Sequence, residues 1–426
     1  MDKVKVIVVG CGDRACVYAE EGVFQLRSME IVAAVDPDKV RLKYMQEHFG
    51  VKSEMCFLHQ DELLSMGKIA DCVINGTMDQ YHLETTIPFL EQGYHMLLEK
   101  PVVNNEKDLL YIRDVANKNN CKLMICHVLR FTPFYKKIKE LLLNDEIGEI
   151  VNIETSERVG VFHSSVSFIR GKWSKESECG SSLLLQKCCH DLDLLCWLNN
   201  VTVPEYVSSF GGRNFILPEK APEGAGNRCL VDCPEEVRKQ CVYDIQSMYL
   251  DNCHLPWYPW QCTGKNYQDV TMEEKIESLK TYNPHGVCAY KAGGDLVDHQ
   301  TLNIHFANGS TAVHTMLLGC AKPGRRIWIV GTKGEIEGSP DRGTLTISKY
   351  SKKTAWYDTV NVDFNDKEGE TGGHFGGDKG LVADFCSLMR GEQPSISCTS
   401  INDSINGHRL VYKAEEARKT NSIVKL

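Results

Sequence analysis

The sequence has no long hydrophobic run and no run of basic residues. None of its apolar stretches approaches the roughly 20 residues that a membrane-spanning helix requires. The formal net charge is −9 over 426 residues, which disfavours binding to nucleic acid or to an anionic membrane surface. Internal repeats and low-complexity tracts are also missing from the sequence. We therefore expect a globular protein that binds neither nucleic acid nor a membrane.

The start of the chain carries no export pattern. Met1-Asp2-Lys3 leads directly into a short apolar run, without the long apolar core and cleavage site of a signal peptide. The 19 cysteines are an odd number, and Cys72, Cys126, Cys196 and Cys386 lie inside apolar runs. Such a pattern indicates reduced thiols, so we expect a cytoplasmic protein.

The most informative motif follows the first apolar run, Val4–Val9. It reads Gly10-Cys11-Gly12-Asp13-Arg14-Ala15 and precedes a helical stretch and a second apolar run that ends at Asp36. A strand, a glycine turn, a helix and an acidic residue closing the next strand form a dinucleotide site. Gly10 permits a tight turn, Gly12 leaves room for a pyrophosphate, and the helix N-terminus offers N–H groups to it.

Asp36 indicates which dinucleotide is bound. Its carboxylate can accept hydrogen bonds from a ribose diol and would repel a 2′-phosphate. Arg41 stands nearby but a helical turn away. We therefore predict a preference for NAD(H) over NADP(H). Ordinary glycine turns also join strands to helices, so plain α/β packing is the alternative to a dinucleotide site.

Residues 1–130 alternate between strands and helices. The expected strands are Lys3–Val9, Ile31–Asp36, Asp71–Asn75, His95–Glu99 and Lys122–Cys126. The expected helices are Ala15–Leu26, Lys39–Phe49, Gln80–Glu91 and Glu106–Asn117. This alternation predicts an α/β Rossmann domain, a doubly wound parallel sheet covered on both faces. Its ligands would lie beyond the carboxyl ends of the strands.

After residue 130 the pattern changes to that of an α+β domain. A long strand is expected at Glu149–Arg158 and a helix at Ser181–Leu198. Shorter strands joined by glycine-containing turns follow at Thr301–Phe306, Ser310–Leu317, Arg326–Val330, Glu335–Glu337 and Thr344–Ser348, and helices at Gly380–Arg390 and Ile401–Lys419. They predict an open, mainly antiparallel sheet. We place the domains at residues 1–127 and 128–426, with a Cys-rich insertion at about 211–294.

A second motif, Glu99-Lys100-Pro101, stands at the end of an expected strand. The proline stops strand pairing and presents Lys100 at the carboxyl edge of the sheet. A resemblance to the Gfo/Idh/MocA oxidoreductases rests on this motif together with Gly10-Cys11-Gly12, Asp36-Pro37, Cys126–Pro133, His190–Leu198 and Gly331–Gly334. It covers nearly the whole chain outside residues 211–294.

The resemblance implies more than the fold. It implies transfer of a hydride between NAD(P) and a hydroxyl of a sugar, a cyclitol or a related polyol. It also implies that His190 matches the family's catalytic histidine. A homodimer or homotetramer built through the open sheet is expected on the same grounds.

The residues of one helix suit this chemistry. Gln186, His190, Asp193 and Trp197 share one helical face, which by itself predicts a polar seam on a half-buried helix as readily as a catalytic site. An imidazole such as His190 can take the proton that leaves an alcohol as hydride leaves carbon. Lys100 can orient the hydroxyl and stabilise the developing alkoxide.

The chain departs from the family pattern at Gln186, where relatives carry an aspartate. A glutamine can position a hydroxyl but cannot carry a proton away. The following Lys187 adds a positive charge near the site if it faces inward, although most lysines are exposed. We predict Lys100 and His190 as catalytic residues, supported by Lys187 and Asp193.

The remaining site predictions concern cofactor and substrate contacts. The predicted cofactor contacts are Gly10, Gly12, Asp13, Arg14, Asp36, Arg41, Asn75, Thr77, His82, Glu99, Lys100 and His127. The predicted substrate contacts are Arg130, Gln186, His299, His374 and Asp378. The last two belong to a glycine-rich loop, Thr371–Asp378, for which a surface loop with Asp378 as helix N-cap is an equal alternative.

No metal is predicted at the catalytic site. Cys229, Cys233 and Cys241 lie near Cys253, His254 and Cys262, but without the spacing of paired zinc knuckles. Unligated thiols are the preferred interpretation, and a structural metal that also uses Cys189 is left open.

We thus expect an NAD-dependent oxidoreductase that acts on a sugar, cyclitol or glycoside. Two alternatives remain. One is an NAD-dependent glycosidase that cleaves by transient oxidation without net redox change. The other is a ligand-sensing Rossmann protein without catalysis, because a fold does not fix a function.

Overall fold

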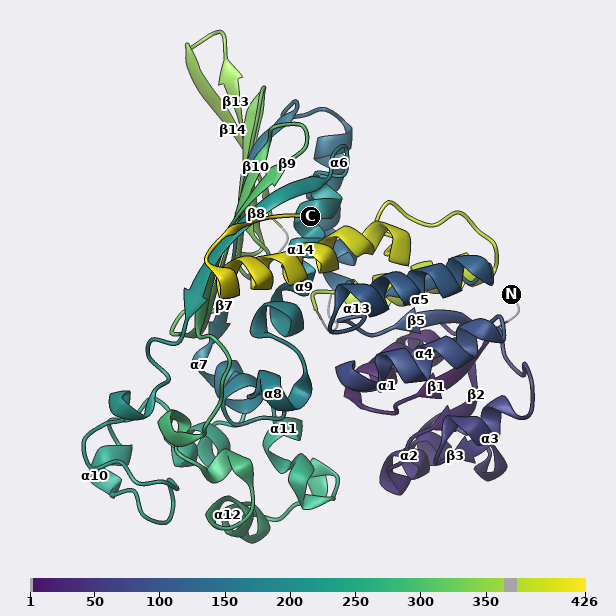
Figure 1. Ribbon diagram of the computed structural model, residues 1–426, viewed down its shortest axis with the longest axis vertical. Helices are drawn as coiled ribbons and strands as arrows, with labels where there is room; N and C mark the ends of the chain where they lie inside the picture. The colour runs from purple at the N-terminus through teal and green to yellow at the C-terminus, as the bar shows by residue number, and fades with distance from the viewer. Residues whose placement is uncertain (1–2, 364–373) are drawn as a thin grey trace.

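The computed structural model describes residues 3–363 and 374–426. Two β-sheets organise these residues, one in the N-terminal part and a larger one in the C-terminal part (Figure 1). Across both ranges, no helix combines the length and the apolar character that crossing a membrane would need.

The first sheet has six parallel strands in the order β3-β2-β1-β4-β5-β6. Its strands are β1 (Val4–Val9), β2 (Met29–Val35), β3 (Cys56–Phe57), β4 (Cys72–Asn75), β5 (His95–Leu98) and β6 (Leu123–Ile125). The connecting helices are α1 (Asp13–Glu20), α2 (Lys39–Phe49), α3 (Gln60–Leu64), α4 (His82–Glu91) and α5 (Glu106–Lys118). This order confirms the predicted Rossmann fold. Strand β3 and helix α3 were not predicted.

The first helix differs from its prediction. It was expected to run as one helix over Ala15–Leu26, but α1 ends at Glu20 and a π-helical turn follows at Glu21–Gln25. The side chain of Met29 fills the space beside Gly22 in this turn, because a Cβ on Gly22 would lie 2.2 Å from the Met29 sulfur.

Both faces of the first sheet are covered, which explains its continuous apolar strands. Val6, Ile7 and Val8 of β1 are fully buried. One face packs against Leu381 and Phe385, from a helix near the C-terminus.

The second sheet has nine strands in the order β14-β13-β12-β11-β7-β10-β9-β8-β15. The strands are β7 (Ile150–Gly160), β8 (Pro204–Gly212), β9 (His299–Phe306), β10 (Thr311–Cys320), β11 (Gly324–Gly331), β12 (Gly334–Ser339), β13 (Thr344–Ser351), β14 (Trp356–Asp363) and β15 (Ile423–Lys425). The central pair, β7 and β10, is parallel and the other pairs are antiparallel. The predicted mainly antiparallel sheet is thereby confirmed. Strands β8, β14 and β15 were missed, and β14 is an edge strand with almost no buried residue to create a pattern.

Four longer helices complete this part of the chain: α6 (Pro133–Leu143), α9 (Leu183–Leu198), α13 (Gly377–Met389) and α14 (Ile401–Thr420). Helix α9 packs against β7 and β10 on one side and against α14 on the other. Helix α14 also contacts α5 of the first part and β8 of the second (Figure 1). It therefore joins the two halves beside α9.

The chain between β8 and β9, residues 213–298, forms short helices, and its apolar residues share a core with Val166 and Ile169. Its helices include α10 (Glu235–Arg238), α11 (Trp257–Trp260) and α12 (Met272–Lys280). Arg170, buried just after β7 and its helical extension, donates hydrogen bonds to the carbonyls of Val287 at 2.7 Å and Tyr243 at 2.9 Å. His285 adds a 3.1 Å contact from Nε2 to the Val166 carbonyl. These contacts attach the segment to the residues that follow β7.

We predict that the protein loses stability as the pH falls, in part because of His285. Burial lowers the pKa of His285 to about 4, whereas an unfolded histidine has a pKa of about 6.5. The unfolded state therefore binds a proton that the folded state does not. Between about pH 7 and about pH 5.5 this difference should lower the free energy of unfolding by about 1 kcal/mol.

Urea denaturation followed by tryptophan fluorescence at the two pH values measures this loss. Between the same two pH values, the free energy of unfolding of the His285→Gln variant should fall by about 1 kcal/mol less than that of the wild type. An identical pH dependence in both proteins would show that His285 does not contribute.

Candidate active site

The glycine turn after β1 is built as the sequence predicts. Gly10 has a φ of +75°, and a Cβ at this position would lie 2.6 Å from the backbone nitrogen of Thr77. Gly12 is the N-cap of α1, and a Cβ there would meet only Arg41, at 3.9 Å. The turn thus needs glycine at position 10 to fold, while at position 12 glycine leaves open space at the helix N-terminus. That open space fits a pyrophosphate.

Asp36 braces this turn from the end of β2. The carboxylate is buried and accepts hydrogen bonds from the backbone N–H groups of Cys11 and Asp38, each at 2.8 Å. Arg41 lies 3.5 Å from one carboxylate oxygen. The predicted contact of Asp36 with a ribose remains a prediction, and its contact with the glycine turn is the one that the structure shows.

The ends of β4 and β5 are joined by polar side chains. Asn75 accepts a hydrogen bond from the Thr77 hydroxyl at 2.8 Å. His82 is fully buried, with Nδ1 2.8 Å from the Pro101 carbonyl and Nε2 3.1 Å from the Thr77 carbonyl. Both ring nitrogens are therefore used inside the fold, and His82 can support the cofactor edge only through the loops that it holds.

Arg14 connects the glycine turn to the C-terminal part of the chain. Its guanidinium donates to Asp378 at 2.5 Å and to Glu99 at 3.3 Å, and Tyr18 donates to Glu99 at 2.6 Å. Burial by itself would raise the pKa of Asp378, but the hydrogen bond from His374 and the charge of Arg14 lower it to about 2. Arg14 thus already has two carboxylate partners.

The glycine-rich loop prediction is tested only in part. Residues 371–373 lie outside the described residues. Helix α13 begins at Gly377 with Gly376 as its N-cap, so the interpretation of Asp378 as the N-cap is wrong. Asp378 lies in the first turn and pairs with Arg14, which leaves His374, 3.2 Å from the same carboxylate, as the more exposed member.

Lys100 and His190 come together across the two parts of the chain. The Lys100 amine donates a hydrogen bond to the carbonyl of Gln186 at 2.8 Å, one helical turn before His190 on α9. Burial lowers the pKa of His190 well below its ordinary value, and the nearby positive charge of Lys100 lowers it further. The imidazole is therefore neutral at neutral pH and can accept a proton.

Gln186 uses its side chain inside the protein. Its amide nitrogen donates to the Ser181 carbonyl at 2.6 Å and approaches the Cys179 sulfur at 2.9 Å. The side chain is thus directed toward the residues before α9, whereas the backbone carbonyl holds Lys100. The substrate contact predicted for the Gln186 side chain finds no support in this arrangement.

Arg130 and Asp193 form a buried ion pair. Arg130 donates from Nε at 2.7 Å and from Nη2 at 2.5 Å to the two carboxylate oxygens, and each side chain is 1% exposed. The third nitrogen of Arg130 donates to the Cys398 carbonyl at 3.1 Å. Arg130 was predicted to contact substrate because it follows a strand end, but each of its three nitrogens donates a hydrogen bond within the core.

His299 is the first residue of β9 and contacts its chain neighbour Asp298. Its Nδ1 lies 2.8 Å from Asp298. Asp298 in turn accepts hydrogen bonds from the backbone of Asn214, Phe215 and Ile216. Asp298 therefore holds the start of the β8–β9 segment, and the substrate contact predicted for His299 stays a prediction.

Lys187 faces inward and lies in a charged network that sequence reasoning missed. Its amine is 3.3 Å from Glu157 on β7, and Glu157 is 3.0 Å from Arg325 on β11. Arg325 also binds Asp191 at 2.8 Å. The general expectation that a lysine is exposed is wrong here, because the side chain of Lys187 is only 18% exposed.

His163 is a further residue that the sequence did not indicate. It ends α7 (Val161–His163), which directly follows β7. Burial and the nearby charge of Lys187 lower its pKa to about 3, and Lys100 contributes in the same direction. His163 is therefore a neutral imidazole beside the two lysines of the site. No motif surrounds it, so only the strand register places it there.

One group of three potential metal ligands is found among the described residues. The ligand atoms of Cys188, Asp191 and His314 lie within 4.8 Å of one another. Arg325 occupies both oxygens of Asp191, at 2.8 and 3.2 Å, and brings a positive charge where a cation would bind. The 19 cysteines are free thiols. Within the described ranges, the ligand atoms of the Cys229, Cys233 and Cys241 set do not meet that 4.8 Å spacing.

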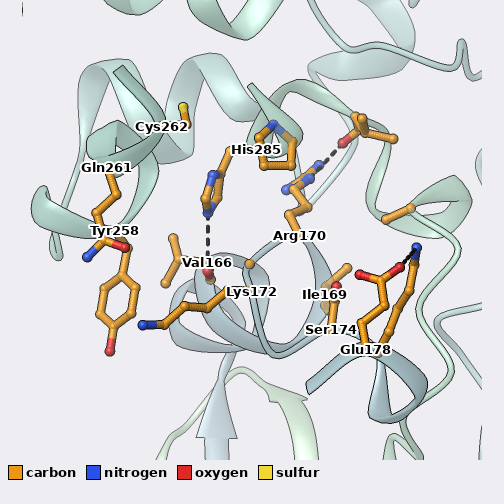
Figure 2. Close-up of a pocket in the computed structure, with 15 residues that line it drawn as sticks. Val166, Ile169, Arg170, Lys172, Ser174, Glu178, Tyr258, Gln261, Cys262 and His285 are labelled. Atoms are coloured by element: carbon orange, nitrogen blue, oxygen red, sulfur yellow. Dashed lines mark hydrogen bonds and ion pairs between the residues drawn. The ribbon is translucent and has the colours of Figure 1, made fainter. Parts of the chain in front are cut away.

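A cavity of about 390 Å³ lies between the residues after β7 and the β8–β9 segment (Figure 2). Lys172, Tyr258 and His285 are among its lining residues. Gln261, which also lines the cavity, donates a hydrogen bond at 3.3 Å to Asp13, the first residue of α1. The β8–β9 segment thus reaches the glycine turn of the first sheet.

We predict that adding one methyl group at either glycine of the turn weakens dinucleotide binding, but that only the change at Gly10 lowers stability. Gly10→Ala should destabilise the protein and abolish dinucleotide binding, because the methyl group would overlap the backbone of Thr77 and the φ is positive. Gly12→Ala should keep the wild-type melting temperature, since only Arg41 is near, yet bind dinucleotide more weakly. Thermal denaturation measures the stability of each variant, and fluorescence titration measures its dinucleotide binding. Equal melting temperatures for the two variants would contradict the prediction.

Comparison with known proteins agrees with this geometry. Residues 4–127 match the model of an oxidoreductase family with an NAD-binding Rossmann fold, and residues 139–426 match the model of that family's C-terminal alpha/beta domain. YteT of Bacillus subtilis, which is named as an oxidoreductase, is 24% identical over 379 residues, which are 86% of this chain and 83% of YteT.

Other relatives match over shorter ranges or in fold alone. Inositol 2-dehydrogenase of Corynebacterium glutamicum (strain ATCC 13032) is 24% identical over 196 residues, 46% of this chain and 54% of that enzyme. An oxidoreductase from Agrobacterium radiobacter, solved with NAD+, L-tartaric acid and magnesium, has a TM-score of 0.68 at 16% identity and covers 100% of this chain and 98% of its own. Since the family models together span most of the sequence, the chain belongs to the Gfo/Idh/MocA oxidoreductases and carries their NAD-binding Rossmann domain.

Proposed function

We propose that this protein is a dehydrogenase that transfers a hydride between NAD and a CH–OH group of a sugar, cyclitol or glycoside. One observation carries the proposal: the Lys100 amine is held 2.8 Å from the Gln186 carbonyl, one helical turn from the neutral His190. Lys100 comes from the carboxyl edge of the NAD-binding sheet and His190 from the second part of the chain. An amine and an imidazole therefore meet where the nicotinamide end of the cofactor is expected.

The cofactor would be held by the turn at Gly10 and Gly12, by the N-terminus of α1 and by Asp36 at the end of β2. When bound, NAD supplies the acceptor for the hydride. Asp36 disfavours a 2′-phosphate, so NAD is proposed as the preferred cofactor over NADP. The other groups at this edge, such as His82, hold the loops in place.

Side chains of the protein accept the proton of the substrate hydroxyl and stabilise the charge left on its oxygen. His190 takes the proton of the substrate hydroxyl as the hydride leaves carbon, since a neutral imidazole within hydrogen-bond reach is a general base. Lys100 donates a hydrogen bond to the same oxygen and stabilises its developing negative charge. With Gln186 in place of a carboxylate, position 186 supplies no acidic partner for Lys100, and the proton goes to His190.

The substrate class is supported by the named functions of relatives. These include inositol 2-dehydrogenase of Corynebacterium glutamicum and trans-1,2-dihydrobenzene-1,2-diol dehydrogenase of Xenopus tropicalis, at 24% and 26% identity. Both names describe the oxidation of a diol or polyol. A homodimer or homotetramer in the cytoplasm is part of the same proposal and rests on the family resemblance.

A glycosidase that works by transient oxidation is the second candidate. The contact of Gln261 with Asp13 favours it, because a segment that reaches the glycine turn would help to retain the cofactor between turnovers. The presence of both Lys100 and His190 argues against a purely ligand-sensing protein.

We predict that Lys100→Met and His190→Ala each lower kcat by at least about 100-fold, as expected for loss of a general base or of an alkoxide stabiliser. The affinity for NAD, measured by fluorescence titration, should change little. Lys107→Met is the matched control, because Lys107 is exposed on α5, and it should keep wild-type kcat.

The assay is a panel of sugars, inositols and glycosides followed by the absorbance of reduced nicotinamide. Cleavage of a glycoside without accumulation of NADH would favour the second candidate. Turnover that survives in both Lys100→Met and His190→Ala would refute the proposed roles.

A further inference from the structure

His127 and His190 meet ring to ring behind the proposed reaction centre. Nδ1 of His127 lies 3.4 Å from Nδ1 of His190, and the two rings are edge to face with 5.5 Å between their centroids. His127 is 1% exposed and His190 is 8% exposed, so His190 is the one nearer to the surface. The proposed function uses His190 alone, which leaves the role of His127 open.

A contact between two Nδ1 atoms requires one proton between two neutral rings. If His190 donates, its Nδ1 carries the hydrogen and its Nε2 has a free lone pair. If His127 donates, the hydrogen of His190 sits on Nε2, and that nitrogen cannot take a proton from a substrate. The two arrangements therefore differ in whether His190 can act as a base.

The surroundings of His127 decide between these arrangements. Nε2 of His127 lies 3.7 Å from a carboxylate oxygen of Asp193 and is buried without a hydrogen-bond partner among the described residues. Asp193 accepts hydrogen bonds from two nitrogens of Arg130, as an ionised carboxylate does. A lone pair on Nε2 would face this negative charge, whereas an N–H would be attracted to it. The hydrogen of His127 is therefore favoured on Nε2, and its Nδ1 is an acceptor.

We propose that His127 is a positioning residue that holds His190 in the tautomer with its hydrogen on Nδ1, and that Asp193 orients His127 in turn. Nε2 of His190 is then free to take the proton of the substrate hydroxyl. The carbon that bears this hydroxyl gives its hydride to NAD in the same step. The proton stays on His190 until it is released, so no further reactant is needed. This inference rests on the base role proposed for His190.

The same environment keeps His127 itself neutral. Burial lowers the pKa of His127 well below its ordinary value, and the charges of Arg130 and Lys100 lower it further. His408 packs at 5.3 Å between ring centroids, and its Nε2 already accepts a hydrogen bond from the Val102 N–H at 3.1 Å. A neutral His127 can accept from His190, which a protonated one could not.

The tautomers can be measured without any substrate. In protein labelled with ¹⁵N at histidine, two-bond ¹H–¹⁵N spectra distinguish a ring nitrogen that carries hydrogen from one that does not. The signals of interest are identified by their loss in His127→Asn and His190→Gln. We expect hydrogen on Nδ1 of His190 and on Nε2 of His127, and the reverse pair would overturn the proposal.

The variants at position 127 test the effect on the reaction. Asparagine can accept a hydrogen bond from His190 through its side-chain oxygen, whereas leucine cannot. His127→Leu should lower kcat by about 10- to 100-fold, as for other groups that orient a functional imidazole, with KM and NAD affinity nearly unchanged. His127→Asn should restore most of kcat. The control is His95→Leu, which removes a histidine at the amino end of β5 that accepts a hydrogen bond from the Lys122 N–H at 3.1 Å and should keep wild-type kcat.

The outcomes separate this inference from the proposed function. A wild-type protein that oxidises none of the alcohols would refute the proposed function, while the spectra would still report the tautomers. A folded His127→Leu protein that binds NAD and keeps wild-type kcat would refute the positioning role alone. If His127→Leu does not fold, the wild-type spectra decide.

Discussion

The buried ion pair of Arg130 and Asp193 is the contact on which the geometry of the site depends. It fixes the turn after β6 to helix α9 with two hydrogen bonds, at 2.7 and 2.5 Å. His127 and His190 belong to the same two elements, so the ion pair helps to hold their contact in place. Removing one partner would leave an uncompensated charge in the core, which typically costs 3–5 kcal/mol. The pair thus couples the placement of the imidazole to the stability of the interface between the halves.

The N-terminal part of the site could be predicted because it is local in sequence. Gly10, Gly12 and Asp36 lie within one β-α-β unit, and Lys100 follows a strand end marked by a proline. The spacing of these residues along the sequence therefore predicts where they lie on the first sheet. Arg130 shows where such reasoning fails: it also follows a strand end, yet it turns into the core because Asp193 lies there.

The parts of the site that were missed depend on contacts between distant segments. Glu157 and Arg325 lie on β7 and β11 and approach Lys187 only because these strands pair beside α9. His163 is placed by the same strand. The parallel pair of β7 and β10 has no short turn to reveal it, and β14 has too few buried residues for a pattern. Neither glycine turns nor helical spacing could indicate these neighbours.

The late position of α13 and α14 has a consequence for synthesis on the ribosome. Val6 and Val8 of the first strand share a core with Leu381 and Phe385. Arg14 forms its ion pair with Asp378, which is synthesised much later. The nucleotide-binding half therefore leaves the ribosome with an apolar face that its own residues cannot cover. Nascent chains in this state are open to aggregation and attract chaperones. A premature stop that removes only α13 and α14 would then destabilise the nucleotide-binding domain.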